Sequence, residues 1–187
     1  MGLIPAVAVP EGQMGAWRVE RFTVERPPLQ YKRRSVPPGS YTRLVHARRG
    51  VVMSDTPDEK RDHLFFVARA QGHVLINGLG LGMCLAAVLR LPQVERVSVV
   101  EADADVIALV GPHFSGDPRV EIVHADAYAY VPPKGVRYGA VWHDIWDEIT
   151  AENLPGMMRL HRKYGRRADW QGSWARDLCE RLRDGRY

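Results

Sequence analysis

Hydrophobic runs typical of buried strands recur through the middle of the chain, and helical segments lie between them. Four short runs have the composition of strands that are buried on both faces. They occupy residues 73–77, 97–101, 120–124 and 138–143. Apolar positions at helical spacing follow the first two runs, at residues 83–91 and 104–109. Strands that alternate with helices predict an α/β fold with a Rossmann-like, doubly wound and mostly parallel sheet.

The N-terminal third follows another pattern, in which apolar and polar side chains alternate. Residues 17–25 alternate over the length of one strand. Residues 41–46 and 51–53 have strand composition and flank a short polar turn, with Gly50 at the turn exit. These features predict a small antiparallel β element.

The segments around this element lack periodicity. Residues 1–16 are expected to form a loose arm, and residues 26–39, with four prolines, predict an extended linker. We therefore expect two units, an N-terminal arm and β-hairpin element over residues 1–55 and the Rossmann-like domain over residues 56–187.

Helical patterns also flank the strand-rich region. Residues 54–59 combine Ser, Thr, Pro and acidic side chains in the order typical of a helix start, and residues 62–70 continue that helix. Beyond residue 150, apolar positions at helical spacing, among them Trp170 and Trp174, predict two helices and no further strand.

Composition excludes several classes of protein. The chain has 187 residues, 45% of them hydrophobic and 26% charged, as in one globular domain rather than a disordered tail or a fibre. Cys84 and Cys179 form neither a CxxC pair nor a Cys/His cluster, so we expect a reducing compartment and no metal. No run approaches the roughly 20 apolar residues of a membrane span. We expect a cytoplasmic protein without a membrane partner.

The net charge of +4 hides an uneven distribution. Residues 1–73 carry +5, residues 74–155 carry −6 and residues 156–187 carry +5. A basic flank can bind nucleic acid or another polyanion. Alternatively its arginines face solvent while Trp170 and Trp174 anchor the last helix to the sheet. The sequence leaves both interpretations open.

A glycine-rich turn lies between the first buried strand and the helix that follows it. Gly78, Gly80 and Gly82 form a GxGxG pattern there, which lets the backbone turn sharply and approach a ligand. Dinucleotide-binding proteins carry their third small residue one place later, where this chain has Met83. The turn therefore indicates a nucleotide-like ligand more than a nicotinamide or flavin dinucleotide.

Acidic residues follow the next three strands. Glu101 ends the second strand, and a carboxylate there can accept both hydroxyls of a ribose. Asp126 follows the third strand and can accept a hydrogen bond from an exocyclic adenine amino group, while Asp144 follows the fourth. Because parallel strands end at one edge of a sheet, we expect these carboxylates to share a crevice.

Together these motifs resemble the nucleotide-binding half of class I S-adenosylmethionine-dependent methyltransferases, and in particular their spermidine synthase-like branch. Residues 74–82 are similar to the glycine strand and turn of spermidine synthases. Residues 99–107 match their E-x-D-x-D-V-I string, and residues 141–147 match their strand-end D-x-x-D. Compared with that family, we expect the sheet to be C-terminally shortened.

The resemblance implies a role for each matching residue. The glycine turn would contact the methionine part of the cofactor, Glu101 the ribose, and Asp126 with Ala127 the adenine. Asp144 would help to deprotonate an attacking amine, with Asp147 nearby. The implied cofactor-binding residues are Gly78, Leu79, Gly80, Gly82, Glu101, Ala102, Asp126, Ala127 and Asp144, and the implied catalytic residues are Asp144 and Asp147.

We expect a methyltransferase that uses S-adenosylmethionine and transfers its methyl group to an unknown acceptor. We expect this acceptor to be a small molecule. One alternative is an aminopropyltransferase that uses decarboxylated S-adenosylmethionine. Another is a non-catalytic module that keeps the fold to bind protein or nucleic acid. Trp146 is expected to line the crevice or the core, with stacking on a base as the alternative. A homo-oligomer would cover an exposed sheet edge.

Overall fold

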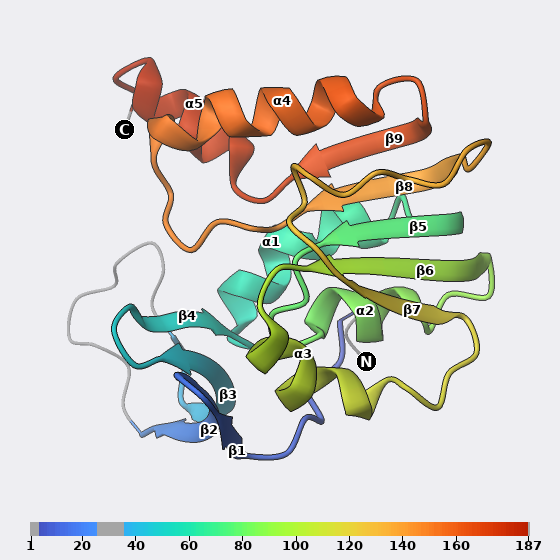
Figure 1. The fold of residues 1–187 in the computed structure, drawn as a ribbon. Coiled ribbons are helices and arrows are strands. Elements are labelled where there is room, and N and C mark those ends of the chain that lie inside the picture. The colour runs from blue at the N-terminus through green and yellow to red at the C-terminus, as the bar shows by residue number, and fades with distance from the viewer. Residues whose placement is uncertain (1–3, 26–35, 187) are drawn as a thin grey trace.

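The computed structural model describes residues 4–25 and 36–186, which form two sheets with helices packed on them (Figure 1). The larger sheet has five strands in the order β7-β6-β5-β8-β9, and every pairing in it is parallel. In chain order its strands are β5 (Gly72–Asn77), β6 (Val94–Glu101), β7 (Val120–His124), β8 (Tyr138–His143) and β9 (Ala168–Ser173). The predicted Rossmann-like parallel sheet is confirmed.

Helices cover both faces of the parallel sheet. They are α1 (Pro57–Val67), α2 (Met83–Val88), α3 (Ala104–Val110), α4 (Leu154–Tyr164) and α5 (Arg176–Arg183), with short 3₁₀ helices at Gly111–His113 and Ala151–Asn153. Successive residues of a strand point to opposite faces. Val74 and Ile76 of β5 therefore share a core with α1, α2 and α3, whereas Leu75 packs with Leu160 and Tyr164 of α4. Among the described residues, no helix is long and apolar enough to span a bilayer.

The smaller sheet is antiparallel, in the order β1-β2-β3-β4. Its strands are β1 (Gly12–Met14), β2 (Trp17–Val24), β3 (Gly39–His46) and β4 (Gly50–Ser54). The predicted hairpin is present as β3 and β4. Trp17, Val19 and Leu44 join the same buried cluster as the residues of α1, α2 and α3. The small sheet thus packs onto the parallel-sheet core, and the boundary placed after residue 55 stays a prediction.

The expectation of a loose arm over residues 1–16 is wrong for its described part. Ile4 and Val9 are 6% and 1% exposed, and the backbone N–H of Val7 donates to Oδ2 of Asp55 at 3.1 Å. The pairing of β1 with β2, the burial of isolated apolar side chains and long-range hydrogen bonds hold this segment. The proline-rich linker expected over residues 26–39 falls mainly on residues 26–35, which lie outside the described residues.

The expectation of no strand after the fourth is also wrong. Trp170 lies in β9, where its ring stacks at 6.3 Å on that of Trp142, and Trp142 stacks at 5.3 Å on Phe66 of α1. Residues 168–173 include Ala, Asp and Gly, which are poor strand formers, so local preference gave no strand signal. The ladder with β8 and the aromatic stack override that preference. The sheet therefore has a fifth parallel strand, one more than the four that the sequence predicted.

Candidate active site

A cavity of about 430 Å³ opens at the carboxyl ends of the parallel strands. Its walls come from the turns after β5, β6, β7 and β8, and from the small antiparallel sheet, which closes one side. Ligand sites of open α/β sheets lie at this edge, where the strand order reverses between neighbouring strands. Here that reversal falls between β5 and β8, because the connections after β5 lead first to β6 and β7 and only then across to β8.

The glycine turn passes within a few ångströms of the turn after β8. Gly78 has φ of +101°, and a Cβ built there would lie 2.0 Å from the backbone oxygen of Asp144. Gly78 therefore needs both the left-handed conformation and the missing side chain that only glycine offers. Gly78 and Gly80 line the cavity.

Two members of the predicted turn do not reach the cavity. Gly82 has φ of +70° and caps α2, with Phe114 packed where its side chain would be. Leu79 is 5% exposed and belongs to the core. Their predicted contact with a cofactor stays a prediction, and the structure places both behind the cavity wall.

Glu101 accepts hydrogen bonds from the backbone of two turns, the glycine turn after β5 and the turn after β6. Its Oε2 accepts the backbone N–H of Leu79 at 2.8 Å, and its Oε1 accepts that of Asp103 at 2.9 Å. A carboxylate has about four acceptor positions, so further positions are available to ligand hydroxyls. Glu101 and the neighbouring Ala102 both line the cavity, and the contact of Glu101 with a ribose stays a prediction.

The segment after β7 forms the next part of the wall. Oδ1 of Asp126 accepts the backbone N–H of Tyr128 at 2.6 Å, which closes a turn, and Asp126 and Ala127 line the cavity. Lys163 of α4 donates to the backbone oxygens of Ala127 and Tyr128 at 2.9 and 3.0 Å. This lysine belongs to the basic C-terminal flank, and its ammonium faces backbone carbonyls rather than open solvent.

Asp144 is a deeply buried carboxyl group of the wall, with a side chain 8% exposed. Burial, together with the neighbouring carboxylates of Glu59 and Asp62, raises its pKa to about 7. A general base works best when its pKa is close to the operating pH. Asp144 is thus suited to accept a proton near neutrality.

The small antiparallel sheet supplies residues that the sequence did not single out. The Arg49 guanidinium lies 4.8 Å over the ring of Trp17, and its Nη1 pairs with Oδ2 of Asp147 at 3.1 Å. The Trp17 indole N–H donates to Oδ2 of Asp103 at 2.7 Å. These contacts join residues 98 and 86 positions apart, which no local pattern reveals. Trp146 also lines the cavity, so its crevice-lining role is confirmed.

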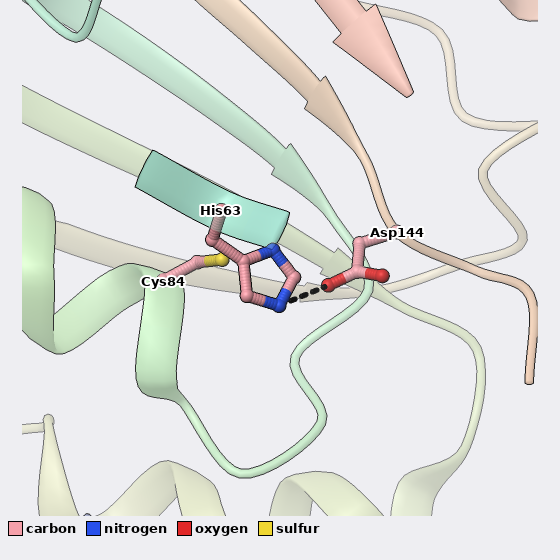
Figure 2. A group of neighbouring side chains, drawn as sticks. All are labelled: His63, Cys84 and Asp144. Atoms are coloured by element: carbon pink, nitrogen blue, oxygen red, sulfur yellow. Dashed lines mark ion pairs between the residues drawn. The ribbon is translucent and has the colours of Figure 1, made fainter. Parts of the chain in front are cut away.

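One group of side chains beside the cavity combines donor types that can hold a metal ion. Donor atoms of His63, Cys84 and Asp144 lie within 4.8 Å of one another. In Figure 2 the thiol and the carboxyl group flank the imidazole from different sides, and only Asp144 faces a ring nitrogen. Burial also raises the pKa of the Cys84 thiol well above its usual range, which disfavours a thiolate. The arrangement therefore favours a histidine–carboxyl pair over an ion-binding trio.

Fold and site together define a class I S-adenosylmethionine-dependent methyltransferase type of fold, with a glycine turn and strand-end carboxylates around its cavity. Residues 62–160 match the spermine/spermidine synthase domain. The chain belongs to the spermine/spermidine synthase family.

Curated relatives share its central part. Polyamine aminopropyltransferase 2 of Ralstonia nicotianae is 32% identical over 111 residues, a match that covers 46% of this chain and 22% of the relative. The polyamine aminopropyltransferase of a Synechococcus species is 35% identical over 85 residues, covering 42% of this chain and 27% of the relative. The chain thus spans about a quarter of the length of these relatives.

Two solved structures are similar to this chain, and the first of them has the same fold. The N-methyltransferase NodS from Bradyrhizobium japonicum superposes with a TM-score of 0.51 at 14% identity, over 68% of this chain and 74% of NodS. The spermidine synthase from Thermotoga maritima gives a TM-score of 0.41 at 26% identity, over 60% and 47% of the two chains.

Proposed function

We propose that this chain is a transferase that binds decarboxylated S-adenosylmethionine and transfers its aminopropyl group to an amine. Membership of the spermine/spermidine synthase family supports this reaction over the methyl transfer expected from the sequence, and so do the names of the curated relatives. The observation that carries the proposal is the charge of the cavity wall.

Carboxylates outnumber cations in that wall. Among the described residues, five acidic side chains line the cavity against a single guanidinium, that of Arg49; the acids are Glu101, Asp103, Asp126, Asp144 and Asp147. Decarboxylated S-adenosylmethionine carries a sulfonium and an ammonium but no carboxylate. Like charges in a partly desolvated site repel. An acidic cavity therefore favours the decarboxylated form over S-adenosylmethionine, whose carboxylate it would face.

The residues of the cavity fit such a nucleoside. Glu101 and Ala102 would hold the ribose, and Asp126 and Ala127 the adenine. Gly78 offers backbone without a side chain beside the reacting end. When bound, the cofactor supplies a carbon that is activated by its sulfonium sulfur.

The residues around that end would supply proton transfer and positioning. The acceptor must lose a proton before its nitrogen has a lone pair, and Asp144 would take that proton on a carboxylate oxygen. The nitrogen then forms the N–C bond as the C–S bond breaks, and the electron pair of that bond leaves with sulfur as a neutral thioether. Holding both partners in line accounts for much of the acceleration of such a displacement.

Calorimetry with the two cofactor forms tests the proposal. We expect the decarboxylated form to bind at least tenfold more tightly than S-adenosylmethionine, a difference of about 1.4 kcal/mol. Glu101→Gln should weaken both, whereas Glu121→Gln, on the exposed face of β7 and paired with Arg96, should weaken neither. Mass spectrometry after incubation with putrescine should show a product heavier by one aminopropyl group. Binding of neither cofactor form by the wild type would overturn the proposal and favour a non-catalytic module.

Methyl transfer from S-adenosylmethionine is the second candidate, and Arg49 is the observation that favours it. Its guanidinium is the one cationic group of the cavity wall within the described part of the chain, and it could pair with the carboxylate of S-adenosylmethionine. Tighter binding of S-adenosylmethionine than of the decarboxylated form would support this reaction instead.

A further inference from the structure

A second titratable group lies directly behind Asp144. His63 of α1 is completely buried, and its Nε2 lies 3.9 Å from Oδ2 of Asp144 (Figure 2). Within the described residues, neither ring nitrogen of His63 has a hydrogen-bond partner. Buried polar atoms without a partner are rare in folded proteins, so these two nitrogens call for a physical account.

The surroundings of His63 keep the imidazole neutral. Burial lowers its pKa to about 4, and the ring of Trp142 packs edge-on at 5.9 Å. The opposite side is occupied by the Cys84 thiol of α2, which burial keeps protonated. A neutral imidazole carries one N–H and one unprotonated nitrogen, so it can donate a single hydrogen bond.

Asp144 is surrounded by other carboxylates. Glu59 and Asp62 face it from α1 and Glu101 from β6, and all three oppose its ionisation. Glu59 is itself held by the backbone N–H and hydroxyl of Ser54, at 2.8 and 2.6 Å. The Trp142 side chain of β8 acts in the opposite direction and lowers the pKa of Asp144, and the imidazole of His63 on α1 is a further neutral group that can donate a hydrogen bond to it.

We propose that His63 is a positioning residue that donates its Nε2 hydrogen to Oδ2 of Asp144 and leaves the other carboxyl oxygen free for the cavity. The bond needs the two atoms to approach from 3.9 Å to about 2.8 Å, a shift that binding of a ligand at the cavity edge can supply. The pair exists whether or not Asp144 acts in catalysis. Its use in accepting the proton of an amine rests on the proposed function.

The proton transfer then has a defined course. The proton of the acceptor goes to the cavity-facing oxygen of Asp144, while Oδ2 keeps the hydrogen bond from His63. The imidazole stays neutral throughout, and the carboxylate becomes a neutral carboxyl group. His63 therefore fixes which oxygen reacts and takes no proton itself.

Nitrogen-15 NMR of the wild-type protein, saturated with the cofactor form that binds more tightly in calorimetry, tests the pair without a variant. We expect His63 to show one neutral tautomer with the hydrogen on Nε2 across the range in which Asp144 titrates, and a shift of that resonance when Asp144 loses its proton. A His63 that carries its hydrogen on Nδ1, or one that becomes charged near neutral pH, would overturn the proposal.

Two substitutions extend the test to the carboxyl group. Carbon-13 labelling of aspartate reports the titration midpoint of Asp144, assigned by comparison with Asp144→Asn. His63→Phe keeps a ring but removes the donor, so the midpoint should rise by about one pH unit. His63→Gln restores a donor and should bring the midpoint back toward that of the wild type. An unchanged midpoint in a folded His63→Phe protein would contradict the pair.

Two controls distinguish the histidine–carboxyl pair from a metal site. Cys84→Ala should leave the midpoint of Asp144 nearly unchanged, because the thiol takes no part in the pair. If zinc alone binds in a one-to-one ratio and this binding is lost in Cys84→Ala, the three side chains form a metal site and the pair is overturned. Cofactor affinity, measured by calorimetry in the same variants, reports on the proposed function separately.

Discussion

The two sides of the cavity are built by different means. The parallel-sheet side comes from backbone geometry, in which glycines turn the chain after β5 and a carboxylate stands at or just after the end of β6, β7 and β8. The antiparallel side comes from side chains that cross from the small sheet, such as Trp17 and Arg49. The first side depends on neighbours in sequence and the second on distant contacts. We therefore expect substitutions on the first side to damage the fold and those on the second to change selectivity.

The largest effect is expected at Gly78. Gly78→Ala places a methyl group against the backbone of Asp144 and forces a positive φ on alanine, which should cost about 2–4 kcal/mol of unfolding free energy. Urea denaturation measures this loss. Gly116→Ala, where a Cβ meets no atom within 4 Å, is the matched control and should change stability little. Equal stabilities of the two variants would remove the steric argument for the glycine turn.

The next effect concerns pH and Asp144. Its folded pKa of about 7 lies above the ordinary value of 3.8, so the folded state binds more protons between these values and loses stability as pH rises through them. Asp144→Asn should therefore be more stable than wild type at pH 8, by a few kcal/mol at most, and this advantage should shrink toward pH 4.

The matched control for this experiment is Asp117, whose pKa is lowered by its hydrogen bonds with Arg119. Its carboxylate stabilises the folded state above the unfolded pKa, and that contribution is lost as pH falls. Asp117→Asn should thus show the opposite trend from Asp144→Asn in denaturation curves recorded across pH. A pH-independent difference between wild type and Asp144→Asn would refute the raised pKa.

A moderate effect is expected from Trp17→Phe on the antiparallel side. The change keeps an aromatic ring under Arg49 but removes the indole N–H that binds Asp103, which should cost about 1–2 kcal/mol. Chemical denaturation and cofactor calorimetry of the same variant separate lost stability from lost binding. Cofactor affinity that falls more than stability would show that this side shapes the nucleoside site.

The smallest effect on stability is expected from Arg49→Gln. The Arg49 side chain is 49% exposed, and exposed ion pairs such as that with Asp147 contribute about 0–1 kcal/mol. Removing the cation should nonetheless weaken S-adenosylmethionine relative to the decarboxylated form, as measured by calorimetry. Arg48→Gln, in the same turn, is the control. A similar change in relative affinity in both variants would show that Arg49 does not bind the carboxylate of S-adenosylmethionine.

Sequence reasoning found the parallel-sheet side because its signals are local. Gly78, Glu101, Asp126 and Asp144 each stand at a strand end, and the parallel topology brings all four to one cavity. The roles assigned to them toward a cofactor stay predictions, as does any nucleic-acid or oligomeric partner.

The remaining features had no local signal. His63 lies within a helix, and only the structure shows that it lies beside Asp144, which is 81 positions away in the chain. Arg49 sits in an ordinary polar turn until the fold places it against Asp147. The spacing of apolar residues around Trp170 predicted a helix where the structure has a strand. The stacking partner Trp142 lies 28 positions earlier in the chain, so the local sequence does not show it. The neighbours of each of these residues come from distant segments of the chain, so the local sequence could not predict them.

The strand order also has a consequence during synthesis of the chain. The central strand β5 pairs with β6 on one side and with β8 on the other. During translation β6 follows β5 closely, whereas β8 emerges only after residue 138. A nascent half-sheet of β5, β6 and β7 would meanwhile expose the apolar edge of β5, which is the kind of edge that invites aggregation. We therefore expect the ribosome-bound chain to be prone to aggregation in the interval before β8 is made.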